Sequence, residues 1–256
     1  MIGYYFPRGM RPSTLEERLS FYKDEFELEK VVDWLKDRTD VVRFAVIIGR
    51  HTKIYPKKYV EDSSTTIIID EYKDMEDVKS WIIEFLPEAV YYDRNIYDEE
   101  EKMVGQELAF DLDPENITCP IHGSLKDKMD RGQGLSFCEL EFQMVKDETI
   151  MLYEHLAEQF SNLRVVYSGR GFHIHVLDKD AYNLDRKGRE AIANEVNSKG
   201  FHIDAWVTTG DMRLIRLPYS LNGLVSRIVI PLDKLELEGF DPANDTRCVP
   251  KFLKLR

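Results

Sequence analysis

The chain has 256 residues, 43% of them hydrophobic, and a formal net charge of −12. This length suits one large domain or two small ones, since domains usually span about 100–200 residues. The acidic balance excludes a generally basic nucleic-acid-binding surface, because phosphate contacts need lysine and arginine, so any such binding would require a local basic groove.

The first half of the chain predicts three helices and two strands. Residues 13–22 begin with Ser13 and Glu16 at the spacing of a capping box. Apolar residues recur at helical or strand spacing in the remaining segments, which are a helix over 27–38, strands over 41–49 and 64–70, and a helix over 75–86 that stops before Pro87. We expect the polar, acidic segment 93–101 to lie on the surface.

The second half adds a strand over 106–113, a helix over 147–160, a strand over 163–169, a helix over 186–200 that ends at Gly200, and strands over 201–207, 213–218 and 226–232. Strands and helices alternate irregularly, which predicts an α/β or α+β fold with central mixed β-sheets flanked by helices. We find no repeat and no linker, so a single domain over residues 1–256 is expected.

Asp111 and Asp113 end an otherwise apolar strand, "ELAFDLDPEN". Residues two apart share a face of a strand, so the two carboxylates repel each other unless a cation neutralises them, and Mg²⁺ or Mn²⁺ prefers such ligands. For an isolated pair of this kind, a strand that runs into a solvent-exposed turn is the commoner case. In "FHIDAWV", read as a strand, Asp204 shares a face with His202 and Trp206 and would complete a three-aspartate, two-metal site for phosphoryl transfer.

The stretch "VVYSGRGFHIHV" places Ser168, Arg170 and His173 around two glycines. Glycine lets the backbone approach a ligand, while the hydroxyl, the guanidinium and the backbone N–H groups suit phosphate oxygens. The alternative is a tight hairpin with half-buried histidines, and for the histidines alone it is preferred. Arg213 and Arg216 follow in a predicted strand, where either one faces the site or lies on the surface.

Cys119-x-x-His122 and Cys138-x-x-Glu141 flank a glycine-rich loop, which is a zinc-knuckle spacing. We expect structural zinc there, with Glu141, Asp130 or a neighbouring carboxylate as fourth ligand; the alternative is a set of unrelated polar residues. The three cysteines, with Cys248 isolated, argue against a disulfide framework and for a reducing compartment. The start of the chain has no signal-peptide pattern and no run reaches about 18 apolar residues, so we expect a soluble cytoplasmic protein without a targeting signal.

These strings, in this order, resemble the small catalytic subunit of archaeal and eukaryotic DNA primase, of the archaeo-eukaryotic primase superfamily. The resemblance implies primer synthesis on single-stranded DNA from nucleoside triphosphates, with a large subunit as partner and an archaeal cytoplasm as location. It implies a zinc-binding insertion at about 117–142. By the same resemblance, Asp111, Asp113 and Asp204 would hold two Mg²⁺ or Mn²⁺ ions, and the incoming triphosphate would meet Ser168, Arg170, His173 and Arg216.

The chain departs from the family's pattern in three places. One arginine, Arg170, stands where relatives have two, and Asn222 and Leu224 stand where relatives carry histidine and lysine in a "SLHGK"-like string. Both changes remove positive charge from the expected triphosphate site, at which we place Asn222. Only about one helix fits between Asp178 and Asp204, so the helical insertion of many relatives is expected to be absent.

Three other functions remain open at this point. One is a primase-related DNA polymerase for repair or for a mobile element, which the same residues would serve. Another is a catalytically weak relative that binds single strands or acts as a scaffold. The third, a metal-dependent phosphodiesterase, needs the carboxylates but no triphosphate-binding turn.

Overall fold

The structure is a computed structural model that describes residues 3–35 and 42–254. It divides into two compact units, each built from segments distant in the sequence. The first comprises Met1–Gly9, Gly105–Arg213 and Pro231–Phe240, and the second comprises Met10–Val104, Leu214–Ile230 and Asp241–Arg256.

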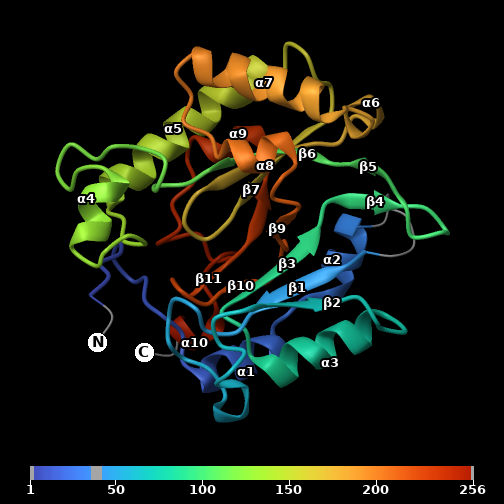
Figure 1. The fold of residues 1–256 in the computed structure, drawn as a ribbon. Helices are drawn as coiled ribbons and strands as arrows, with labels where there is room; N and C mark the ends of the chain where they lie inside the picture. Colours follow the sequence, from blue (N-terminus) through green and yellow to red (C-terminus); the bar gives the residue numbers. More distant parts are fainter. Residues whose placement is uncertain (1–2, 36–41, 255–256) are drawn as a thin grey trace. The chain divides into compact units, whose positions relative to one another are not determined.

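The second unit is organised around a four-stranded sheet in the order β2-β1-β3-β9 (Figure 1). Its neighbouring strands pair antiparallel, and the central strand β1 is buried throughout. The strands are β1 (Phe44–Ile47), β2 (Thr66–Ile69), β3 (Ala89–Asp93) and β9 (Leu214–Arg216). The helices are α1 (Leu15–Asp24), α2 (Leu28–Leu35), α3 (Met75–Phe85), the 3-10 turn η1 (Lys57–Tyr59) and α10 (Lys251–Lys254).

Helix ends in this unit follow local chemistry. Asp74 caps α3, and Leu86 takes a left-handed conformation directly before Pro87, as the predicted stop requires. The predicted cap of the first helix was wrong by one residue. Thr14 and Glu17 form the capping box, because the Ser13 hydroxyl instead donates to the carbonyl of Gly223.

The first unit contains a second four-stranded sheet, in the order β12-β7-β8-β6. Its strands are β6 (Leu108–Leu112), β7 (Leu163–Tyr167), β8 (Phe172–Val176) and β12 (Ile230–Leu232). Its helices are α4 (Leu125–Asp130), α5 (Glu139–Leu156), α6 (Lys179–Tyr182), α7 (Arg186–Ser198), α8 (Ala205–Thr209) and α9 (Lys234–Leu237). Helix α5 packs on β8, and α5 and α7 lie side by side (Figure 1), joined by His155 Nε2 and Glu195 Oε1 at 3.1 Å.

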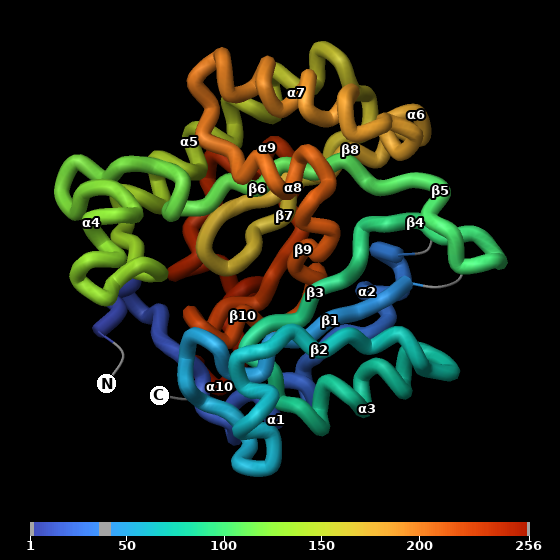
Figure 2. Tube along the Cα trace, in the orientation of Figure 1, coloured from blue at the N-terminus to red at the C-terminus, as the bar shows by residue number. Residues whose placement is uncertain are grey.

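Two short hairpins complete the chain, β4 (Asn95–Tyr97) with β5 (Met103–Gln106) and β10 (Leu221–Asn222) with β11 (Arg227–Ile228). Near the N-terminus, the segment around Tyr5 runs beside the loop that follows α4 (Figure 2), where the Tyr5 N–H donates to Ser136 Oγ at 3.1 Å. Within the described ranges, no helix combines the length and the apolar character needed to cross a bilayer.

The predicted α+β class is confirmed, with one four-stranded sheet in each unit and antiparallel pairing in the register of β1–β2, β1–β3, β3–β9, β6–β8 and β7–β8. The predicted helix over 27–38 and strand over 41–49 are present where described, while residues 36–41 lie outside the described ranges. The helix predicted over 147–160 is longer, since α5 begins at Glu139. One-turn helix α6 precedes α7 in the stretch expected to hold a single helix.

Two further predictions were wrong, one of them in part. Residues 201–207 do not form a strand, because Asp204 caps helix α8 and Gly210 ends it in a left-handed conformation. Strong caps at both ends outweigh the alternating apolar pattern. The segment 93–101 is only partly at the surface, since Asp93 and Arg94 are buried.

Candidate functional site

The end of strand β6 presents the predicted aspartates. Leu108, Phe110 and Leu112 are buried, as the face assignment predicts, and Asp111 is partly exposed opposite His173 of β8. The His173 ring nitrogen Nε2 lies 3.5 Å from Asp111 Oδ1. Pairing with β8 therefore places a carboxylate and an imidazole together at one end of a rigid sheet.

A backbone hydrogen bond joins Asp204 to Asp111. Its N–H donates to the Asp111 carbonyl at 2.9 Å, and its Oδ1 accepts from the N–H of Trp206 at 2.9 Å. Helix α8 packs against β6. The cap that overturns the predicted strand thus also brings Asp204 to Asp111 and orients its side chain.

The turn Ser168–Gly171 packs directly on the end of β6. Ser168 N–H donates to the Gly171 carbonyl at 3.0 Å, and Gly171 N–H donates to Ser168 Oγ at 3.1 Å. Gly169 has a φ of 101°. A Cβ on Gly171 would lie 2.5 Å from Asp113 Oδ1 and would clash with the Leu112 carbonyl. Glycine is therefore required for this close approach of the turn to Asp113.

Arg170 projects from this turn into a buried, acidic environment. Its Nη2 lies 2.6 Å from Glu115 Oε1, and its side chain is 9% exposed. Burial alone would lower the pKa of Arg170, but the carboxylates of Glu115, Asp113 and Asp111 raise it above its ordinary value. The guanidinium thus stays fully charged beside the candidate metal-binding carboxylates.

A second histidine–carboxylate pair lies on the same two strands. His175 Nδ1 contacts Glu107 Oε1 at very short range, and both side chains are buried. The rings of His173 and His175 lie 5.8 Å apart between centroids. Both histidines are buried, more deeply than the half-buried pair of the hairpin interpretation, and each lies beside a carboxylate, Asp111 for His173 and Glu107 for His175.

The other predicted residues are divided between the units. Arg213 is the last residue of the segment Gly105–Arg213 of the first unit, whereas Arg216 and Asn222 belong to the second unit. Arg216 Nη2 donates to the Tyr91 hydroxyl at 3.2 Å. Asn222 is buried, and its Oδ1 accepts from the N–H of Leu224 at 3.2 Å.

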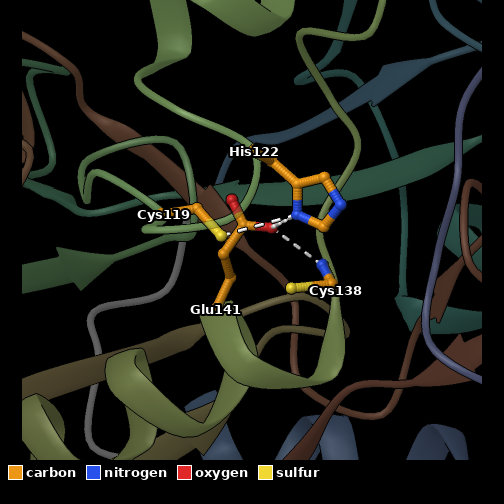
Figure 3. A group of neighbouring side chains, drawn as sticks. All are labelled: Cys119, His122, Cys138 and Glu141. Carbon is orange, nitrogen blue, oxygen red and sulfur yellow. Dashed lines mark hydrogen bonds and ion pairs between the residues drawn. The ribbon is translucent and has the colours of Figure 1, made fainter.

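The four predicted zinc ligands converge (Figure 3). One ligand atom from each of Cys119, His122, Cys138 and Glu141 lies within 4.8 Å of the others. Among the described residues this is the one group of three or more His, Cys, Asp or Glu close enough to hold a metal ion. Asp111, Asp113 and Asp204 do not form such a group; what joins Asp204 to Asp111 is the backbone hydrogen bond.

Local contacts hold Glu141 in this cluster. Cys138 caps α5, and its N–H donates to Glu141 Oε2 at 2.8 Å. Lys128 Nζ lies 2.6 Å from Glu141 Oε1, with both side chains fully buried. Burial and then the Glu141 charge raise the pKa of Tyr5 to about 12, and the Tyr5 ring lies 4.6 Å from that of His122. Two sulfur atoms, an imidazole and a carboxylate fit the donor set of structural zinc.

Similar proteins place the chain in a family. The chain is 52% identical to an uncharacterized DNA primase small subunit-like protein of Archaeoglobus fulgidus, and the match covers 98% of this chain and 94% of that protein. The chain belongs to the DNA primase small subunit family. A family model described as DNA primase small subunit matches residues 110–202, the segment that carries both aspartates of β6, the zinc-type cluster and the Ser168–Gly171 turn.

More distant members of the primase family are longer than this chain. The DNA primase small subunit PriS of Pyrococcus furiosus is 32% identical over 72% of the chain but only 48% of that protein. For PriS of Pyrococcus horikoshii the identity is 29%, over 74% of the chain and 50% of that protein. A solved polymerase domain of Mycobacterium tuberculosis Ligase D, in complex with DNA, has the same fold at a TM-score of 0.55 and 14% identity, covering 91% of this chain and 88% of that one.

In this primase-family chain, sequence reasoning missed three partners of the candidate site. They are Glu115 beside Arg170, Glu107 beside His175, and Lys128 beside Glu141. Glu115 had a sequence signal, since it continues the alternation of Asp111 and Asp113 by one more step. Lys128 had none, because its burial depends on how α4 folds against α5.

Proposed function

We propose that this chain is a nucleotidyltransferase that synthesises short primers on single-stranded DNA from nucleoside triphosphates. One observation supports this most directly. The end of β6 carries Asp111 and Asp113, receives the backbone of Asp204, and is covered by the Ser168–Gly171 turn with its buried arginine. The proposal thus rests on carboxylates suited to metal ions and donors suited to phosphate in neighbouring segments at one strand end, the two kinds of group that phosphoryl transfer uses.

The three aspartates would hold two Mg²⁺ or Mn²⁺ ions, whose oxygen preference they match. Such ions, when bound, help to ionise the attacking 3′-hydroxyl and neutralise the triphosphate and the departing pyrophosphate. The chain's own contribution is placement. Strand β6 holds Asp111 opposite His173, and Asp113 follows directly after the strand; the backbone bond from Asp204 to Asp111 places the third aspartate, and the N–H of Trp206 holds its carboxylate.

Ser168, Arg170 and His173 would bind the triphosphate of the incoming nucleotide. The turn offers backbone N–H groups and a hydroxyl, and Arg170 adds a permanent positive charge. Arg216 and Asn222 belong to the second unit, and their part in nucleotide binding is proposed from the family resemblance alone. Alignment of the nucleotide and stabilisation of charge then provide most of the catalysis.

Zinc held by Cys119, His122, Cys138 and Glu141 would be structural. These ligands tie the loop before α4 to the start of α5, and the segment between them has few apolar side chains of its own. A large primase subunit and single-stranded DNA are the proposed partners. The overall charge of −12 makes weak template binding by the isolated chain the expected behaviour, so a partner would supply part of the affinity.

The test is primer synthesis on unprimed single-stranded DNA with Mg²⁺ or Mn²⁺, with labelled ribo- and deoxynucleotides in separate reactions. Wild-type chain should give metal-dependent products that Asp111→Asn abolishes. Asp180→Asn, at an exposed position of α6, is the matched control and should retain them. A melting temperature unchanged in Asp111→Asn would show that the loss is chemical. Normal product from that variant would refute the metal assignment.

The preferred sugar decides between two related enzymes. Ribonucleotide incorporation indicates a primase, and exclusive use of deoxynucleotides indicates a primase-related DNA polymerase for repair or for a mobile element. Absence of product in every reaction, even with a large subunit from a relative, would favour a single-strand-binding or scaffolding role. One observation favours that second candidate: Asn222 and Leu224, where relatives carry histidine and lysine, are both buried and neither is charged.

A further inference from the structure

Arg170 is engaged by a carboxylate from its own chain. Its Nη2 lies 2.6 Å from Glu115 Oε1, and the Glu115 side chain is only 28% exposed. On another side, the guanidinium carbon lies 5.7 Å from the centre of the Phe137 ring. The residue assigned to the triphosphate is therefore held in place by an internal anion.

This contact uses only half of one edge of the guanidinium. Nε and Nη2 are both buried, and neither makes a hydrogen bond to a described residue, so the contact of Nη2 with Glu115 is an ion pair. Nε and Nη2 together form the edge that binds two phosphate oxygens in parallel. Glu115 lies at the Nη2 position of that edge, while Nε has no bonded partner among the described residues, so an oxygen that reaches this edge meets an unused donor.

Glu115 stands on a short irregular segment between Asp113 and Cys119. The Asn116 N–H donates to the Asp113 carbonyl at 2.9 Å, which forms a turn, and no helix or strand includes Glu115. Its carboxylate can thus leave Nη2 by side-chain rotation alone, whereas Arg170 is fixed by the turn packed on β6. Of the two partners, Glu115 is the one that moves.

We propose that Glu115 is an internal competitor of the triphosphate for Arg170, and so a residue that sets nucleotide affinity. This rests on the function proposed above. A phosphate that binds both Nε and Nη2 must displace the Glu115 carboxylate. The displaced carboxylate then lies near the phosphates and repels them. Glu115 therefore weakens nucleotide binding, unlike a residue that merely positions Arg170, which would strengthen it.

Binding, measured apart from catalysis, tests this. The full chain is titrated calorimetrically with a non-hydrolysable nucleoside triphosphate in Mg²⁺, and with inorganic tripolyphosphate as a base-free probe. Glu115→Gln should lower the Kd by about tenfold, the effect of removing one competing ion pair. Glu139→Gln, at an exposed position of α5, is the matched control and should not change it.

A double-mutant cycle localises the effect. In an Arg170→Met background, Glu115→Gln should improve binding by a clearly smaller factor, because the competition for the guanidinium is gone and only the repulsion between the carboxylate and the phosphates remains to be relieved. If Glu115→Gln folds poorly, Glu115→Asp serves instead, since its shorter carboxylate withdraws from Nη2 and should lower the Kd by a smaller factor. Weaker or unchanged binding in a folded Glu115 variant would overturn the inference. Wild-type chain that binds neither ligand would overturn the proposed function as well, which separates the two failures.

Discussion

Two buried arginines, one in each unit, have opposite surroundings. Arg18 in the second unit is completely buried, and it donates to neutral acceptors at 3.0–3.1 Å, namely Ser13 Oγ, Thr52 Oγ1 and the carbonyls of Ile48, Ile54 and Leu86. Arg170 in the first unit faces the carboxylates of Glu115, Asp113 and Asp111, and its Nε is left without a hydrogen bond.

The pKa values move in opposite directions for this reason. Burial lowers the pKa of Arg18 to about 10, since carbonyl dipoles only partly replace water. For Arg170 the neighbouring carboxylates outweigh burial and raise it. Satisfied donors and neutral partners characterise an arginine that holds the fold together. Excess negative charge and an available donor characterise one that awaits a ligand.

Replacing Arg18 should have the largest effect on stability. Arg18→Met removes the donors from three buried carbonyls and two hydroxyls, so we expect the free energy of unfolding to fall by about 3–5 kcal/mol. Urea unfolding measures this. Arg170→Met should cost less stability, because it leaves one partly exposed carboxylate without its ion-pair partner rather than five hydrogen-bond acceptors. Equal destabilisation by the two substitutions would break the comparison.

Glu88, beside Arg18, should dominate acid sensitivity in the second unit. Burial alone would raise its pKa, but bonds from the His51 ring and from the N–H of Thr52 lower it from 4.5 to about 2. A carboxyl whose pKa is lower in the folded state stabilises above its unfolded pKa. That stability, about 3 kcal/mol, is lost as the pH falls from 4.5 towards 2. Unfolding followed from pH 6 to 2.5 should show this loss.

Glu88→Gln is the matching variant for this pH dependence. It should be less stable than the wild type at pH 6 and should lose less on acidification, so that the two stability curves approach each other at low pH. Parallel curves would show that Glu88 does not carry the acid dependence.

One cysteine from each unit gives a second comparison, Cys138 in the first unit and Cys248 in the second. Cys138→Ser should release zinc and lower the melting temperature. Loss of a residue that only supports a ligand weakens metal binding by about 10–100-fold, so loss of the ligand itself should weaken zinc binding more. Cys248→Ser is the matched control, because burial raises the pKa of that thiol to about 12 and it lies apart from the four-ligand cluster. Zinc content by atomic spectroscopy and thermal melting check both variants. Full zinc content in Cys138→Ser would reject the site.

Much of the candidate site could be predicted from local pattern. Period-two alternation placed Asp111 and Asp113 opposite the buried Leu108–Phe110–Leu112 face, and the Gly-Arg-Gly spacing predicted the tight turn that packs on Asp113. The spacing of Cys119, His122 and Cys138 predicted a cluster that the fold forms, with Glu141 as the fourth member. These features depend on residues close in sequence, whose geometry the backbone largely dictates.

Other features depended on contacts that no local pattern encodes. Asp204 was predicted on a strand, yet it caps α8, and its tie to Asp111 joins segments far apart in the chain. Likewise, nothing local distinguishes Arg18, surrounded by carbonyls, from Arg170, surrounded by carboxylates. The sequence by itself determined most of the element types, the strand-end aspartates and the metal-type spacing, because these follow from short-range geometry. Only the tertiary structure decided which charges are buried together, because burial and pairing arise from packing between distant segments.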